Sequence, residues 1–267
     1  MTTCIAAIGM SEGLDEEGEA LVFATDRMIT SMLLGQFEHN IEKYRRLTPT
    51  TVAMVSGELN NYQKIFDNLK IEDSYDTIEQ KIYDNIIKER DGMIEKEIFS
   101  RFKIDQDYIK NVLSDNMPNK IIDGMLNDIK NFEFQVSVLL AGFKGGHAYI
   151  SDIKERSISY RRDISFSAIG SGSIQAINTL FFQKHSKNEG IKTTLYNVYK
   201  AKRNSEVAIG VGKETDLFIL SNTGNLYKVE QENISKLSEI YESEMKYGKE
   251  SKHLNDIIES LKKNKNQ

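Results

Sequence analysis

The chain opens with the stretch Met1-Thr-Thr-Cys-Ile-Ala-Ala-Ile8, in which two small hydroxyl residues precede an apolar run. The run has the length and composition of a buried β-strand, which we expect over residues 2–9. A Met followed by a small Thr is the kind of chain end that cells trim, and removal of Met1 would leave Thr2 with a free amine. The hydroxyl of such a threonine is a nucleophile, and its own amine, with a pKa of about 8, can serve as the base.

The composition describes an ordinary globular chain with one main core. Of the 267 residues, 39% are hydrophobic and 28% charged, which suits a single domain with additions. The net charge of −5, without a long basic run, argues against nucleic acid as the main partner. No run approaches the roughly 18 apolar residues of a membrane span, and the start lacks the basic segment of a secretory signal. With Cys4 as its single cysteine, the chain has no internal disulfide framework, and we expect a cytoplasmic protein with no membrane partner.

Hydrophobic spacing predicts strands, then helices, then strands, helices and strands again. Such an order is typical of a layered α/β sandwich, in which helices cover sheets. We expect residues 1–230 to form the main domain, with an enlarged helical segment at about 60–133, and residues 231–267 to form a C-terminal helical extension. The expected strands are 2–9, 20–24, 51–55, 134–143, 147–150, 157–160, 165–169, 216–220 and 225–229, and the later helices cover about 173–185 and 193–203.

Three further residues could support Thr2 chemically. Asp26 follows the second expected strand, and Lys43 precedes the strand that ends at Gly57. A nucleophilic hydroxyl benefits from a fixed ammonium group beside it, and a buried ammonium needs a carboxylate partner because an unpaired buried charge is costly. A backbone N–H at a glycine can stabilise an oxyanion, which contributes roughly 3–4 kcal/mol in known cases. The sequence therefore offers one candidate for each part: Thr2 for the nucleophile, Lys43 for the ammonium group, Asp26 for its carboxylate partner and Gly57 for the oxyanion donor.

With these parts in place, the sequence resembles the proteasome β-subunits and their bacterial relatives, within the N-terminal nucleophile hydrolases. The resemblance covers roughly residues 2–57 and 134–220. Met-Thr-Thr-Cys-Ile is similar to the family's Thr-Thr-x-Val start, which implies Thr2 as the nucleophile. Ala-Thr-Asp-Arg-Met-Ile-Thr (24–30) is similar to its Ala-x-Asp/Glu-x-x-x-Thr motif, which implies the carboxylate role for Asp26. Lys43 precedes Gly57 by the interval that separates lysine from the oxyanion glycine in archaeal β-subunits.

Two later segments extend the resemblance. Ala168-Ile-Gly-Ser-Gly-Ser173 is similar to the family's Gly-Ser-Gly-Ser segment, whose first serine lies beside the nucleophile, and this implies Ser171 with Ser173 adjacent. The alternative interpretation of this segment is a turn with Ser173 as a helix N-cap. The family's Asp-x-x-Ser has its nearest match in Arg203-Asn-Ser-Glu206, with Asn204 in place of Asp as a supporting residue.

The resemblance implies a four-layer αββα sandwich, with an extended helical insertion and a C-terminal helix, and threonine-type peptide hydrolysis. It also implies a self-compartmentalising homo-oligomeric ring that acts on peptides or unfolded proteins, with an ATPase or another regulator as partner. No cofactor is expected, and no metal, because the four histidines are isolated and lack metal-ligand spacing.

Two alternatives remain open from the sequence. The same site could serve a small-substrate amidase or a peptide ligase, in which an amine rather than water resolves the acyl-enzyme. The chain could also be a non-catalytic ring subunit or scaffold. Structural subunits of the family carry a leading extension that buries the chain start, so an unextended Thr2 favours catalysis.

Overall fold

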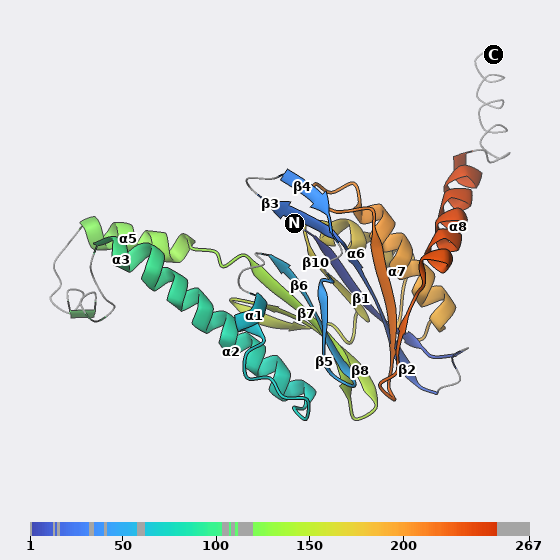
Figure 1. Ribbon diagram of the computed structural model, residues 1–267, viewed down its shortest axis with the longest axis horizontal. Helices are drawn as coiled ribbons and strands as arrows, with labels where there is room; N and C mark the ends of the chain where they lie inside the picture. The colour runs from blue at the N-terminus through green and yellow to red at the C-terminus, as the bar shows by residue number, and fades with distance from the viewer. Residues whose placement is uncertain are drawn as a thin grey trace, which may run out of the picture.

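Two five-stranded antiparallel sheets lie face to face in the computed structural model, which describes residues 2–12, 14, 17–31, 35–39, 42–57, 62–102, 107, 110–111 and 120–249. Helices cover the outer face of each sheet, so that the chain forms four layers (Figure 1). Three apolar clusters fill the spaces between these layers. Alternation along β1 divides its residues between two of them: Ile5 and Ala7 face the helices, whereas Cys4 and Ile8 face the other sheet.

The first sheet has the strand order β10-β1-β2-β11-β12. Thr3 pairs with Gly170, Cys4 with Thr25 and Asp26 with Thr215. The start of β1 therefore lies at the same end of the sheet as the end of β2. The strands are β1 (Thr3–Met10), β2 (Glu19–Asp26), β10 (Phe166–Gly170), β11 (Thr215–Ser221) and β12 (Leu226–Lys228).

The second sheet has the order β5-β6-β7-β8-β9, and a separate hairpin joins β3 to β4. Gly57 pairs with Val136, and Ser137 pairs with Lys154. The end of β6 therefore lies beside the start of β7 and the end of β8. The strands are β3 (Met28–Ser31), β4 (Gly35–Glu38), β5 (Tyr44–Thr48), β6 (Thr51–Gly57), β7 (Val136–Lys144), β8 (His147–Lys154) and β9 (Ser157–Tyr160).

Different helices cover the two sheets. Those on the first sheet are α6 (Ser173–Phe182), α7 (Ile191–Ser205) and α8 (Gln231–Lys249), and those on the second are α1 (Tyr62–Ile65) and α2 (Tyr75–Ile94). Isoleucines 78, 82 and 86, spaced four apart, are the buried stripe of α2. Beyond Ile94, a π-helical turn (Glu95–Phe99), α3 (Ser100–Phe102) and α5 (Lys120–Asn131) extend away from the sheets (Figure 1). Helix is thus found in the described part of the expected segment 60–133, and the C-terminal helix is found up to Lys249.

Candidate active site

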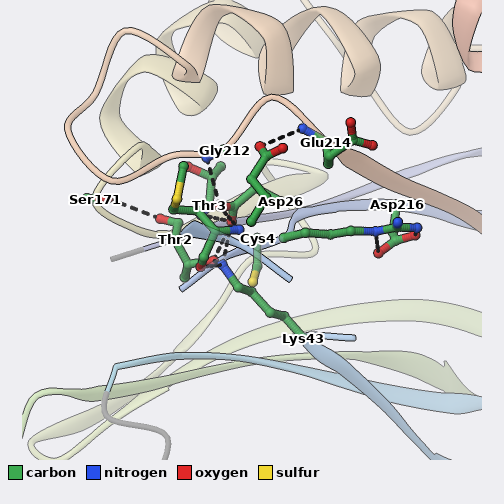
Figure 2. A network of polar contacts seen from close by, with 12 residues as sticks. Thr2, Thr3, Cys4, Asp26, Lys43, Ser171, Gly212, Glu214 and Asp216 are labelled. Carbon is green, nitrogen blue, oxygen red and sulfur yellow. Dashed lines mark hydrogen bonds and ion pairs between the residues drawn. The ribbon is translucent and has the colours of Figure 1, made fainter. Parts of the chain in front are cut away.

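Thr2 lies buried at the entrance to β1, at one end of the space between the sheets. Its carbonyl oxygen accepts hydrogen bonds from the Ser171 hydroxyl, at 3.3 Å, and from the Gly172 N–H, at 3.5 Å. Its hydroxyl donates a short hydrogen bond to Asp26 and accepts one from the Lys43 ammonium group at 2.5 Å (Figure 2). Backbone and hydroxyl are therefore both fixed.

Asp26, the last residue of β2, is fully buried and accepts hydrogen bonds on both carboxylate oxygens. Oδ1 accepts from the Thr3 N–H at 2.8 Å and from the Lys43 ammonium group at 2.9 Å. Oδ2 accepts from the N–H groups of Met28 and Gly212, each at 3.0 Å. The carboxylate thus ties the start of β1 to the first residue of β3 and to the loop before β11.

The surroundings of Asp26 favour its ionised form. Burial by itself raises the pKa of this carboxyl group, but the Lys43 charge and the hydrogen bonds from Thr2, Gly212 and Thr3 outweigh burial and hold the pKa below its usual value. A negative charge therefore stays beside Lys43 throughout the neutral pH range.

Lys43 reaches from the second sheet to the first. It lies immediately before β5, where its carbonyl accepts a hydrogen bond from the Val55 N–H at 3.2 Å. Its buried ammonium group donates to Thr2 and Asp26 and, at 2.5 Å, to the Met28 carbonyl. These three acceptors match the three N–H bonds of an ammonium group, so its orientation is set.

Gly57 ends β6 with φ +131°, a conformation that side chains strongly disfavour. A Cβ atom there would lie 2.0 Å from the Gln135 carbonyl oxygen. Gly57 lines the same cavity as Ser171, whose hydroxyl holds the Thr2 carbonyl. The structure therefore brings Gly57 to the end of the sandwich where Thr2 lies.

The expected Gly-Ser-Gly-Ser segment packs directly against the chain at Thr2. Gly170 has φ +93°, and a Cβ atom there would lie 2.1 Å from the Thr2 carbonyl oxygen, so only glycine allows this approach. Ser173 is the first residue of α6, lines the cavity beside Ser171, and is not the N-cap, which is Gly172. The alternative interpretation of Ser173 as an N-cap is therefore wrong by one position.

Asn204 is not brought to Thr2. Its side-chain N–H donates to the Thr179 hydroxyl at 3.0 Å, and its oxygen accepts from the Tyr241 hydroxyl at 2.7 Å. These bonds join α7 to α6 and α8 on the helical side of the first sheet. The supporting position inferred for Asn204 from the Asp-x-x-Ser comparison is thus corrected: its contacts are between helices.

The sequence interpretation missed Lys202 and Glu38, which hold the loop beside Asp26 from two sides. The ammonium group of Lys202, on α7, is buried and donates to the carbonyls of Gly212, at 2.8 Å, and Lys213, at 2.7 Å, and to Glu206 at 2.7 Å. The Gly212 N–H in turn donates to Asp26. Burial lowers the pKa of Lys202, and the Glu206 carboxylate opposes that effect. Lys202 therefore fixes the loop that supports the carboxylate.

This loop is held from its other side by the β3–β4 hairpin. The Glu38 carboxylate accepts from the N–H of Lys213 at 2.5 Å and from that of Glu214 at 3.0 Å. In the sequence, the role of Lys202 is indicated only by the four-residue spacing of Lys202 and Glu206. Ordinary ion pairs on helix surfaces have the same spacing, so the pattern does not point to this loop.

Comparisons with known proteins bear on the fold. No protein-family model matches the chain, and a search of curated proteins found no match. Among solved structures, the chain is similar to the Anbu (Gly-1) mutant from Hyphomicrobium sp. strain MC1, with a TM-score of 0.61 and 15% sequence identity. The alignment covers 94% of this chain and 97% of that one. The chain has the Anbu fold. The four-layer, proteasome-like sandwich expected from the sequence is thereby confirmed.

On this Anbu-like fold, Thr2 is better suited than Cys4 to act as a nucleophile. Burial raises the pKa of the Cys4 thiol to about 12, so the thiol stays protonated, and it donates a hydrogen bond to the Val55 carbonyl at 3.7 Å. The Thr2 hydroxyl, by contrast, lies between an ammonium group and a carboxylate. An ammonium group in this position stabilises the negative charge that develops on the oxygen during attack.

The part of the chain that the structure describes was also searched for metal sites and for membrane-spanning helices. Within the described ranges, no group of three or more His, Cys, Asp or Glu side chains is placed to hold a metal ion. In the same part of the chain, no helix is both long and apolar enough to cross a membrane.

Proposed function

We propose that the chain is a cytoplasmic threonine-type peptidase that uses Thr2 as an N-terminal nucleophile after removal of Met1. The observation that carries this proposal is the buried contact of the Thr2 hydroxyl with both Lys43, at 2.5 Å, and Asp26. The proteasome-like fold supports it, and so does the position of the site, where Lys43 from the second sheet reaches Thr2 at the start of the first. A buried ion pair around a hydroxyl at the start of a strand is costly to maintain, and nucleophilic catalysis gives a reason to maintain it.

Each residue has a defined role in the proposed reaction. The Thr2 oxygen attacks the peptide carbonyl while the Thr2 amine takes up the hydroxyl proton, directly or through a water molecule. Lys43 stabilises the charge on the attacking oxygen, Asp26 holds Lys43, and the Gly57 N–H binds the oxyanion. The peptide nitrogen then leaves with the proton, and an ester to Thr2 remains. Water hydrolyses this ester and restores the hydroxyl, while Ser171 holds the Thr2 backbone.

The first test uses the intact mass of the purified protein. We expect the mature chain to lack Met1, because retained Met1 would convert the base of the mechanism into an amide. After reaction with a peptide β-lactone, the mass should rise by one inhibitor per chain, and cleavage of fluorogenic peptides should fall in proportion. Active material that mostly retains Met1 would contradict the mechanism. Labelling without any peptide cleavage would favour the small-substrate amidase.

We also infer that the protein forms a closed homo-oligomeric ring fed by an ATPase or another regulator. Support comes from apolar side chains, each more than half exposed, on α6 and the loop after α7: Ile174, Phe181, Phe182, Val207 and Ile209. Large apolar side chains that are exposed to this extent are typical of protein contact surfaces. Multi-angle light scattering should report a mass several times the 30.5 kDa of one chain. A monomer at micromolar concentration would argue against the ring and for the amidase or ligase.

A further inference from the structure

A cavity of about 360 Å³ opens beside the proposed nucleophile, between Gly57 of one sheet and Ser171 at the end of the other. Its size falls in the range of roughly 300–1,000 Å³ that is common for ligand sites. Polar side chains dominate its wall, including Ser56, Ser137 and Lys154. The proposed mechanism gives these side chains no role.

The polar wall follows from the strand register. Ser56 pairs with Ser137, and Ser137 pairs with Lys154, so the three residues form a row across β6, β7 and β8. Alternation places this row on the face that carries Met54 and Leu139, which is the face turned toward the first sheet. The space between the sheets is therefore apolar in its interior and becomes polar and positively charged at the end nearest Thr2.

Charge decides which ligand the cavity suits. Lys154 is the one charged side chain among the described residues that line it. The Lys154 ammonium group lies 3.5 Å from the Asp152 carboxylate, but Asp152 also lies 3.7 Å from Arg161. Two cations thus share one anion, and the group keeps a net positive charge. With its side chain 52% exposed, Lys154 lies open to a ligand.

We propose that this cavity is a substrate subsite that binds an aspartate or glutamate side chain of the peptide, close to the scissile bond. Lys154 supplies the opposite charge, and the Ser56 and Ser137 hydroxyls supply hydrogen bonds to the carboxylate. The inference rests on the proposed function and adds its substrate class: peptides that carry an acidic residue at one fixed position.

The test is a panel of quenched fluorescent peptides in which each position around the cleavage site holds Glu, Gln or Lys in turn. At one position we expect Glu to exceed Lys in kcat/KM by about tenfold, since Lys154 attracts one charge and repels the other. Lys154→Met should remove most of this preference, and Lys154→Glu should reverse it.

Lys144→Met is the matched control. Lys144 lies at the opposite end of the same sheet, its side chain is also 52% exposed, and it pairs with Asp76 at 2.6 Å. This variant loses the same charge and should keep the preference for Glu. Equal turnover of all peptides by the unmodified protein, or a Glu preference that survives in Lys154→Met, would overturn the subsite while leaving the peptidase intact. If no peptide is cleaved and Thr2 takes up no β-lactone, the proposed function fails and the subsite fails with it.

Discussion

Lys43→Ala is expected to lower kcat for peptide cleavage by about 10³-fold or more, since it removes the charge that stabilises the attacking oxygen. Asp26→Asn should have a smaller effect, because the amide still accepts one hydrogen bond from the lysine. Lys43 and Asp26 act as a unit around one hydroxyl. The double variant should therefore be hardly less active than the worse single one. Additive losses, or normal turnover by Lys43→Ala, would refute the assignment.

Measuring the stability of these variants shows whether a loss of activity comes from lost catalysis or from unfolding. Lys43→Ala leaves the fully buried Asp26 without its cation, which should cost about 3–5 kcal/mol of unfolding free energy. The double variant contains neither charge, so it should recover part of that loss and remain inactive. Thermal unfolding measured beside kcat reports both effects.

Arg27→Met is the control for this pair. The Arg27 guanidinium group binds Asp216 with distances of 2.9 and 2.5 Å; Arg27 directly follows β2, and Asp216 lies on β11. Loss of this neighbouring pair should leave kcat within a few-fold of the unmodified protein.

The sequence was sufficient to predict the parts of the site that lie at strand ends. Strand positions follow from apolar runs, and the family resemblance paired Thr2 with Asp26; in the structure, the register of β1 and β2 brings the two strand ends together. Lys43 and Gly57 could be added because a buried nucleophile needs a cation and an oxyanion donor. The expected strands were found in the structure, with ends that differ by at most two residues from the prediction, except that β8 continues to Lys154 instead of ending at Ile150.

The features that were missed depend on tertiary contacts. β5 has the sequence Tyr-Arg-Arg-Leu-Thr, whose charged outer residues hide its strand character, and it is defined by pairing with β6. The link from Lys202 through Gly212 to Asp26 joins a helix to a loop through backbone carbonyls, which leave no pattern in the sequence. Asn204 was misplaced for a related reason: its position in a short motif said nothing about which face of α7 it occupies.

Thr2→Ala should abolish both peptide cleavage and labelling by a peptide boronate or β-lactone, and this is the most direct test of the proposed chemistry. The substitution removes a hydroxyl and a methyl group, while the hydrogen bonds between Lys43 and Asp26 remain. We therefore expect a loss of about 1–3 kcal/mol in unfolding free energy and an intact fold. Thr2→Ser keeps the hydroxyl and the amine, and should retain part of each activity.

The residue to which the electrophile attaches gives a further test of the threonine mechanism. Peptide mapping should locate the adduct on Thr2 and not on Cys4, because burial keeps the Cys4 thiol protonated with a pKa of about 12. Labelling that persists in Thr2→Ala, or that maps to Cys4, would show the threonine mechanism to be wrong. If the assembled protein with a free Thr2 neither labels nor cleaves, the buried Lys43–Asp26 pair must be explained as a structural ion pair, and the non-catalytic ring subunit becomes the better assignment.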